Sequence, residues 1–168
     1  RYTDLQILQF MIGFHVSKSG RKMPDAFEKD MEMLKNYGFL RPCAQIFISG
    51  PRDFHPMNQL ELDGMKTKIS QSGIPVYVHG AYVDNPWSLN AASIKNIISE
   101  MQNCHYIGAR GLVVHLANSA IRDDVLFDVL NSLASLSEDI KREVVLYFEI
   151  HTAKPSISTY ETPEKLHV

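Results

Sequence analysis

Five short apolar runs recur along the chain, and an amphipathic stretch separates each run from the next. The runs occupy residues 9–16, 43–48, 74–78, 111–114 and 144–148. They are continuously apolar rather than alternately apolar and polar, which is typical of parallel strands with both faces covered. Intervals of roughly 30–35 residues leave room for one right-handed crossover helix between successive strands. This rhythm predicts an α/β fold built on a parallel sheet.

The stretches between the runs have the periodicity of amphipathic helices. One helix is predicted to begin after Ser88, a good N-cap residue, and to end before Gly108. Within it, apolar residues recur at i, i+3, i+4 and i+7 as far as Cys104. The other predicted helices span residues 24–37, 60–72 and 125–136. Strands and helices therefore alternate along most of the chain.

Two architectures can hold such a series of strand–helix units. An open doubly wound sheet usually carries a G-x-G-x-x-G phosphate loop after its first strand, and residues 15–20, HVSKSG, do not match it. A closed (β/α)8 barrel usually takes about 250 residues, so about five units make only part of one. We therefore expect a partial TIM barrel with parallel strands. Residues 1–168 would form a single domain that is the incomplete N-terminal part of the barrel.

Composition limits the classes of partner. The formal net charge is -2, so no overall basic field favours nucleic acid, and any DNA contact must come from a local patch or from particular side chains. Hydrophobic residues make up 45% and charged residues 21%, which is typical of a soluble globular domain. No apolar run approaches the roughly 20 residues of a membrane span, so no membrane partner is expected.

The two cysteines, Cys43 and Cys104, lie in apolar surroundings in the sequence. We interpret both as small buried hydrophobic residues rather than a disulfide pair, which fits a reducing compartment. The start of the chain has no signal-peptide pattern. The expected location is therefore the cytoplasm or another reducing intracellular compartment, and not the secretory pathway.

Three of the predicted strands end on a residue type that binds metals. The runs that begin at residues 74, 111 and 144 lead into His79, His115 and Glu149. Parallel barrels keep their active sites at the C-terminal ends of the strands, so these three side chains should converge. Two imidazoles and one carboxylate suit zinc. From the pattern alone, a metal or catalytic site and a set of hydrogen-bonded strand-end residues remain equally open.

The segments around these residues resemble a known family. They are GFHVS at 13–17, FISGPR at 47–52, VHGAY at 78–82, VHL at 114–116 and YFE at 147–149. In order, spacing and strand-end position they resemble the motifs of the endonuclease IV family of AP endonucleases, over nearly the whole chain. The segments 50–52 and 82–87 look most like the divergent versions carried by large cytoplasmic DNA viruses, which would make the protein virus-associated.

The resemblance implies a role for each matching residue. His79 and His115 fall on ligands of one Zn²⁺, and Glu149 falls on the carboxylate that bridges it to a second and is the candidate catalytic residue. Arg52 and Tyr82 fall on side chains inserted into the duplex at the abasic nucleotide. The implied activity is zinc-dependent hydrolysis of the phosphodiester 5′ to abasic sites in double-stranded DNA, a step of base excision repair.

The resemblance also implies what this chain lacks. The family completes a site for three zinc ions with ligands from later strands, and these ligands have no counterpart before Val168. At most part of the metal site is therefore expected here, and self-association through open barrel edges is expected as well. The loop after Glu149 also differs from the family, and His151 there is a weak additional ligand candidate. His15 is expected to be a buried strand residue near the site.

Other functions stay open at this point. A metal-dependent sugar isomerase or epimerase can use the same barrel, and an inactive half-barrel fragment is a third possibility. Arg52 and Tyr82 favour DNA, whereas an isomerase would need a proton-relay residue that the sequence does not identify. Without the family, Arg52 would be interpreted as a solvated loop charge and Tyr82 as an aromatic residue packed on Trp87.

Overall fold

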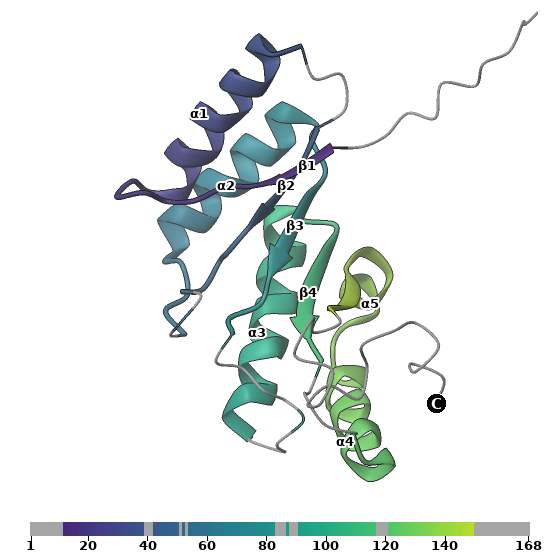
Figure 1. The fold of residues 1–168 in the computed structure, drawn as a ribbon. Coiled ribbons are helices and arrows are strands. Elements are labelled where there is room, and N and C mark those ends of the chain that lie inside the picture. Colours follow the sequence, from purple (N-terminus) through teal and green to yellow (C-terminus); the bar gives the residue numbers. More distant parts are fainter. Residues whose placement is uncertain are drawn as a thin grey trace, which may run out of the picture.

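The fold is an alternation of strands and helices, seen in a computed structural model (Figure 1). The structure describes residues 12–38, 42–50, 52, 54–82, 87, 91–116 and 121–149. The elements in chain order are β1 (Ile12–His15), α1 (Met23–Asn36), β2 (Pro42–Ile46), α2 (Gln59–Ser72), β3 (Val76–His79), α3 (Ala91–Ile107), β4 (Gly111–His115), α4 (Asp123–Ala134), α5 (Glu138–Glu143) and β5 (Val145–Glu149).

The five strands form one sheet in the order β1-β2-β3-β4-β5, and every neighbouring pair is parallel. In a doubly wound sheet the strand order reverses at a switch point, whereas in a barrel each strand is added beside the previous one. The observed order over the described strands is that of a barrel. The prediction of an α/β, partial TIM-barrel fold is therefore confirmed.

Helices cover one face of this sheet. Helix α1 packs on α2, α2 on α3, and α3 on β4 and α5, so the helices follow one another along the sheet (Figure 1). The strand residues that face them are buried, and they form the core with apolar residues of the helices. The buried apolar side chains of the strands that belong to this core are Ala44, Ile46, Val76, Val78, Leu112 and Val114.

The described elements leave the opposite face of the sheet open, and we call it the inner face. A hollow of about 490 Å³ lies on it, lined mainly by Gly13, Phe14, His15, Cys43, Gln45, Tyr77, Val113 and Tyr147. The continuous apolar runs predicted strands covered on both faces, which is wrong for the described part of the chain. Those runs reflect side chains, such as Tyr77 and Tyr147, that pack beside one another on the inner face, with ring centroids 5.8 Å apart.

The helix boundaries follow local chemistry. The side chain of Asn58 caps α2 by accepting a hydrogen bond from the backbone N–H of Glu61 (3.0 Å), and Gly73 ends it with a left-handed φ of 63°. The short helix α5 was not predicted, because its six residues bury only Ile140 and show no full apolar period. Residues 9–11 of the predicted first strand and the proposed N-cap Ser88 lie outside the described residues. The single-domain assignment stays a prediction.

The close pairing of β4 with β5 depends on Gly111. A Cβ atom at this position would lie 2.5 Å from the Tyr147 ring and would also collide with the carbonyl oxygen of Val145. Only glycine lets the aromatic ring lie over β4 at this point. The pairing then runs in register to the ends of both strands, where His115 is opposite Glu149.

Both cysteines are free thiols. Cys104 is fully buried, as predicted, and burial followed by the neighbouring Glu100 raises its thiol pKa well above the ordinary value. Cys43 is only half-buried, because it lies on the open inner face, and burial raises its pKa as well. Raised pKa values keep both thiols protonated and unreactive. Among the described helices, none has the length and apolar character needed to cross a membrane.

Candidate metal centre

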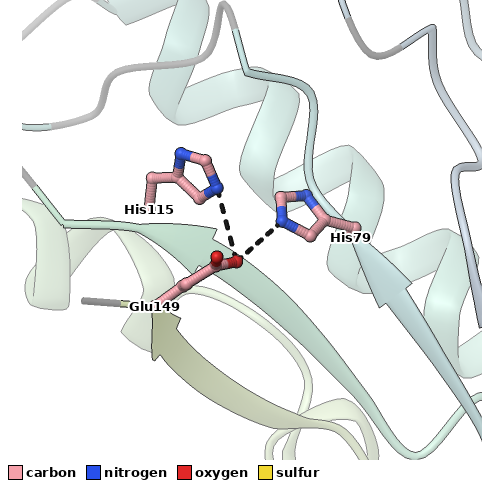
Figure 2. A group of neighbouring side chains, drawn as sticks. All are labelled: His79, His115 and Glu149. Carbon is pink, nitrogen blue, oxygen red and sulfur yellow. Dashed lines mark hydrogen bonds and ion pairs between the residues drawn. The ribbon is translucent and has the colours of Figure 1, made fainter. Parts of the chain in front are cut away.

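The structure brings together the three strand-end residues that the sequence singled out (Figure 2). His79 is the last residue of β3, His115 the last of β4 and Glu149 the last of β5. Glu149 Oε2 lies 2.9 Å from His79 Nε2 and 3.4 Å from His115 Nε2. The ligand atoms of all three lie within 4.8 Å of one another. His79 is buried, His115 is half-buried, and half of the Glu149 side-chain surface is exposed.

A backbone carbonyl fixes the orientation of the His79 ring. Nδ1–H of His79 donates a hydrogen bond of 2.8 Å to the carbonyl oxygen of Gly80. A neutral ring in this tautomer directs the lone pair of Nε2 toward the Glu149 carboxylate, and two acceptors 2.9 Å apart repel unless a cation or a proton lies between them. Metal-binding histidines commonly donate their other N–H in this way.

The spacing of the ligand atoms also fits zinc. Nitrogen and oxygen ligands about 2.0–2.2 Å from one tetrahedral zinc ion lie roughly 3.3 Å from each other. Two of the separations, 2.9 Å from His79 Nε2 to Glu149 Oε2 and 3.4 Å from His115 Nε2 to Glu149 Oε2, lie on either side of this value. By donor chemistry, orientation and spacing, the residues present fit a zinc ion.

A buried carboxylate lies next to Gly80, on the helix side of the sheet. Glu100 of α3 is fully buried, and its Oε2 would lie only 3.1 Å from a Cβ atom at position 80. Residue 80 must therefore be small, because a larger side chain at this position would collide with Glu100. Glu100 was not predicted to lie here, although a charged residue on an otherwise apolar helix face is a signal that could have found it.

Aromatic rings stand beside the two imidazoles. The Tyr82 ring centroid lies 5.1 Å from that of His79 and 5.0 Å from that of His115, and the Tyr82 side chain is 54% exposed. Phe47, the first residue after β2, contacts His79 at 5.1 Å and Tyr82 at 5.4 Å. Tyr82 therefore covers the cluster on one side and still presents a free edge to solvent.

The remaining candidates are placed less centrally. Arg52 is exposed in the segment after β2, and within the described part of the chain no hydrogen bond or ion pair joins it to the cluster. His15 was expected to be buried but is exposed, because the inner face beside it is open; its ring packs edge-on against Phe47 at 5.0 Å. His151 lies outside the described residues.

Trp87 was not predicted to contribute to the centre. Its indole N–H donates to the carbonyl oxygen of His115 (3.0 Å), and its ring packs on Phe148 with centroids 5.6 Å apart. No periodicity marks this residue, since it lies in the segment between β3 and α3. Being the chain's single tryptophan was the one available signal.

The fold and the site together define a class of protein. This class comprises parallel α/β barrels in which three consecutive strands present two histidines and a glutamate at their C-terminal ends. Enzymes of this architecture carry out their chemistry at that end of the barrel.

Sequence comparison finds viral relatives. The chain is 31% identical over 128 residues to a probable AP endonuclease of African swine fever virus (isolate Pig/Kenya/KEN-50/1950); the match covers 73% of this chain and 40% of the relative. The corresponding protein of strain Badajoz 1971 Vero-adapted is 31% identical over 134 residues, covering 77% of this chain and 42% of the relative. The chain therefore spans about two fifths of the length of these curated relatives. No protein-family model matches it.

Structure comparison finds solved structures with a similar fold. The crystal structure of AsfvAP:AG matches with a TM-score of 0.68 and 23% identity, over 83% of this chain and 47% of that one. Endonuclease IV from Thermus thermophilus matches with a TM-score of 0.63 and 21% identity, over 84% of this chain and 52% of that one. At these identities the likeness shows a shared fold. Together with the viral sequences, it confirms the predicted resemblance to the endonuclease IV-type AP endonucleases.

Proposed function

We propose that this chain is part of a zinc-dependent AP endonuclease that hydrolyses the phosphodiester 5′ to abasic sites in double-stranded DNA. The observation that carries the proposal is the convergence of His79, His115 and Glu149 at three strand ends. The names of the relatives favour this function over a sugar isomerase or epimerase. In the cell the activity would belong to base excision repair. The free thiols of Cys43 and Cys104 suit a reducing compartment.

In this proposal His79, His115 and Glu149 hold zinc. A bound zinc ion supplies a Lewis acid for a phosphate oxygen and a water of lowered pKa. The chain's own groups hold the ligands in place: the Gly80 carbonyl fixes the His79 ring, and Tyr82 covers both imidazoles. Glu149 is the candidate catalytic residue, since its carboxylate faces both histidines and keeps half of its side-chain surface open. The family's set of three Zn²⁺ ions would need ligands beyond these three residues.

Tyr82 and Arg52 are the proposed DNA contacts. Both are exposed, and Tyr82 stands directly over the metal ligands. An abasic nucleotide has lost its stacking partner, so the insertion of an aromatic ring and a guanidinium into the base stack costs least at that position. Selection of the abasic site would then depend on a few side chains, which agrees with a net charge of only -2.

Replacement of Tyr82 by alanine is expected to reduce discrimination between abasic and intact duplex by roughly tenfold, because one stacking contact contributes about 1–3 kcal/mol. Dissociation constants for two duplexes that differ only at the abasic position would measure this. Tyr37→Ala is the matched control, since Tyr37 is 74% exposed at the end of α1, on the other side of the sheet. Equal weakening on both duplexes would mean that Tyr82 serves only to pack the histidines.

The activity itself is tested with the longest reading frame that contains these residues. A duplex with one abasic analogue should be cut on its 5′ side in the presence of zinc and leave a 3′-hydroxyl, and the intact duplex should not be cut. Absence of incision by a zinc-loaded, folded protein would contradict the proposed function and favour an inactive barrel. Conversion of an added free sugar to its isomer, with no cleavage of the abasic duplex, would favour the isomerase alternative.

A further inference from the structure

We propose that Trp87 is a positioning residue for the metal centre, which joins the end of β4 to the end of β5 and so sets the separation of His115 from Glu149. This inference rests on the metal centre of the proposed function and adds a residue that the ligand chemistry alone does not identify. Trp87 touches neither the ligand atoms nor the substrate in this proposal. It acts through the backbone of His115 and through Phe148, the residue directly before Glu149.

The contacts of Trp87 are directed at both strands. The indole N–H donates to the backbone carbonyl of His115 at 3.0 Å, so the bond holds the main chain of a ligand residue. The indole ring packs on Phe148, the residue directly before Glu149, with centroids 5.6 Å apart and planes inclined by 56°. One side chain therefore contacts β4 at its last residue and β5 at its penultimate residue.

The paired ends of β4 and β5 need a contact that holds them together. β5 is an edge of the described sheet and is held by hydrogen bonds to β4 alone. The final bond of this pairing runs from the Leu116 N–H to the Glu149 carbonyl, at 3.0 Å. Phe148 is 39% exposed, so the end of β5 has little other packing. Ends of edge strands open locally at low cost in free energy, and a third segment that binds both strands opposes that opening.

The effect on metal binding follows from the tolerance of zinc. Metal–ligand distances must hold to within about 0.2 Å, and groups that only orient ligands typically change affinity by 10–100-fold. His115 Nε2 and Glu149 Oε2 are 3.4 Å apart on two neighbouring strands, so fraying of either strand separates them. Trp87 therefore restricts the relative motion of the ends of β4 and β5, which would change the separation of His115 from Glu149.

Two substitutions separate the contribution of the Trp87 hydrogen bond from the contribution of its ring packing. Trp87→Phe removes the indole N–H and keeps an aromatic ring on Phe148, whereas Trp87→Leu removes both. The matched control is Tyr106→Phe, which also deletes one aromatic donor, the hydroxyl that bonds Asp63 at 2.5 Å on the helix side of the sheet. Zinc affinity would be measured by competition with a chromogenic chelator, and ligand geometry by the visible spectrum of the Co²⁺-substituted protein.

We expect Trp87→Phe to weaken zinc binding by about tenfold and to change the Co²⁺ spectrum, with a larger loss for Trp87→Leu. Tyr106→Phe should match the unmodified protein. Unchanged zinc affinity and an unchanged Co²⁺ spectrum in Trp87→Phe would overturn the inference. Equal losses in Tyr106→Phe and Trp87→Phe would also overturn it, since they would reveal only a general loss of stability.

Amide hydrogen exchange gives a second measurement that needs no metal. In the metal-free protein, the Leu116 N–H should exchange faster in Trp87→Phe than in the unmodified chain, because its bond to Glu149 is released more often. Failure of the unmodified chain to bind zinc would refute the metal centre itself. Faster Leu116 exchange would then still support the link between β4 and β5, and unchanged exchange would refute that link too.

Discussion

Replacement of His115 by alanine is expected to lower the zinc affinity of the protein by about 100-fold or more, since even groups that only orient ligands contribute 10–100-fold. His115 is the better target of the two histidines, because it is half-buried and its loss leaves the core intact, whereas His79 is buried. The expected result is near-complete loss of bound zinc at micromolar metal. Elemental analysis of the purified protein, and titration of the metal-free protein with zinc, would measure it.

A second histidine–glutamate pair provides the control. His105 of α3 lies 3.2 Å from Glu143 at the opposite end of the strands, and it resembles the His115–Glu149 pair in chemistry but not in surroundings. His105→Ala should therefore leave zinc affinity unchanged. If His115→Ala keeps its zinc while it remains folded, the three strand-end residues are not a metal centre, and the proposed function loses the observation that carries it.

The cluster of His79, His115 and Glu149 could be predicted because topology determines where strand ends lie. Once the apolar runs are identified as consecutive parallel strands, any polar residue that directly follows a run must lie at the same end of the sheet, where all the strands have their C-terminal ends. His79, His115 and Glu149 needed no further information to be grouped. Their exact separations, and the Gly80 carbonyl that fixes one ring, depend on backbone geometry that a residue pattern does not contain.

Other features could not be predicted for a different reason. His15 was expected to be buried because the strand pattern assumes cover on both faces, and its exposure follows from the open inner face. Trp87 lies between two elements, where neither helical nor strand periodicity applies. A loop residue is placed by the tertiary structure around it, so its contacts with His115 and Phe148 appear only in three dimensions.

The open inner face and the two edge strands lead to a prediction about the 168-residue chain in solution. Among the described strands, β1 and β5 each have one neighbour, so each presents unpaired backbone donors and acceptors. β5 also carries large apolar side chains that are exposed: Val145 by 48%, Tyr147 by 40% and Phe148 by 39%. An edge with both properties pairs readily with another chain. We expect the chain to self-associate, with a mass in solution above the 19.1 kDa of a single copy.

A charge at this edge should oppose the association. Val145→Lys places an ammonium group on the exposed surface of β5, where natural edge strands often carry lysine, and burial of that charge between two copies is unfavourable. We expect the concentration needed for association to rise by about tenfold or more, because misplaced interface charges cost several kcal/mol. Light scattering over a range of protein concentrations would measure it.

Leu60→Lys is the matched control, because Leu60 is 70% exposed on α2, which covers the helix side of the sheet, and the same charge there should leave association unchanged. A chain that is monomeric at all concentrations before any substitution would show that the edges of β1 and β5 are protected. If Leu60→Lys dissociates the chains as effectively as Val145→Lys, general charge repulsion and not edge pairing governs the association.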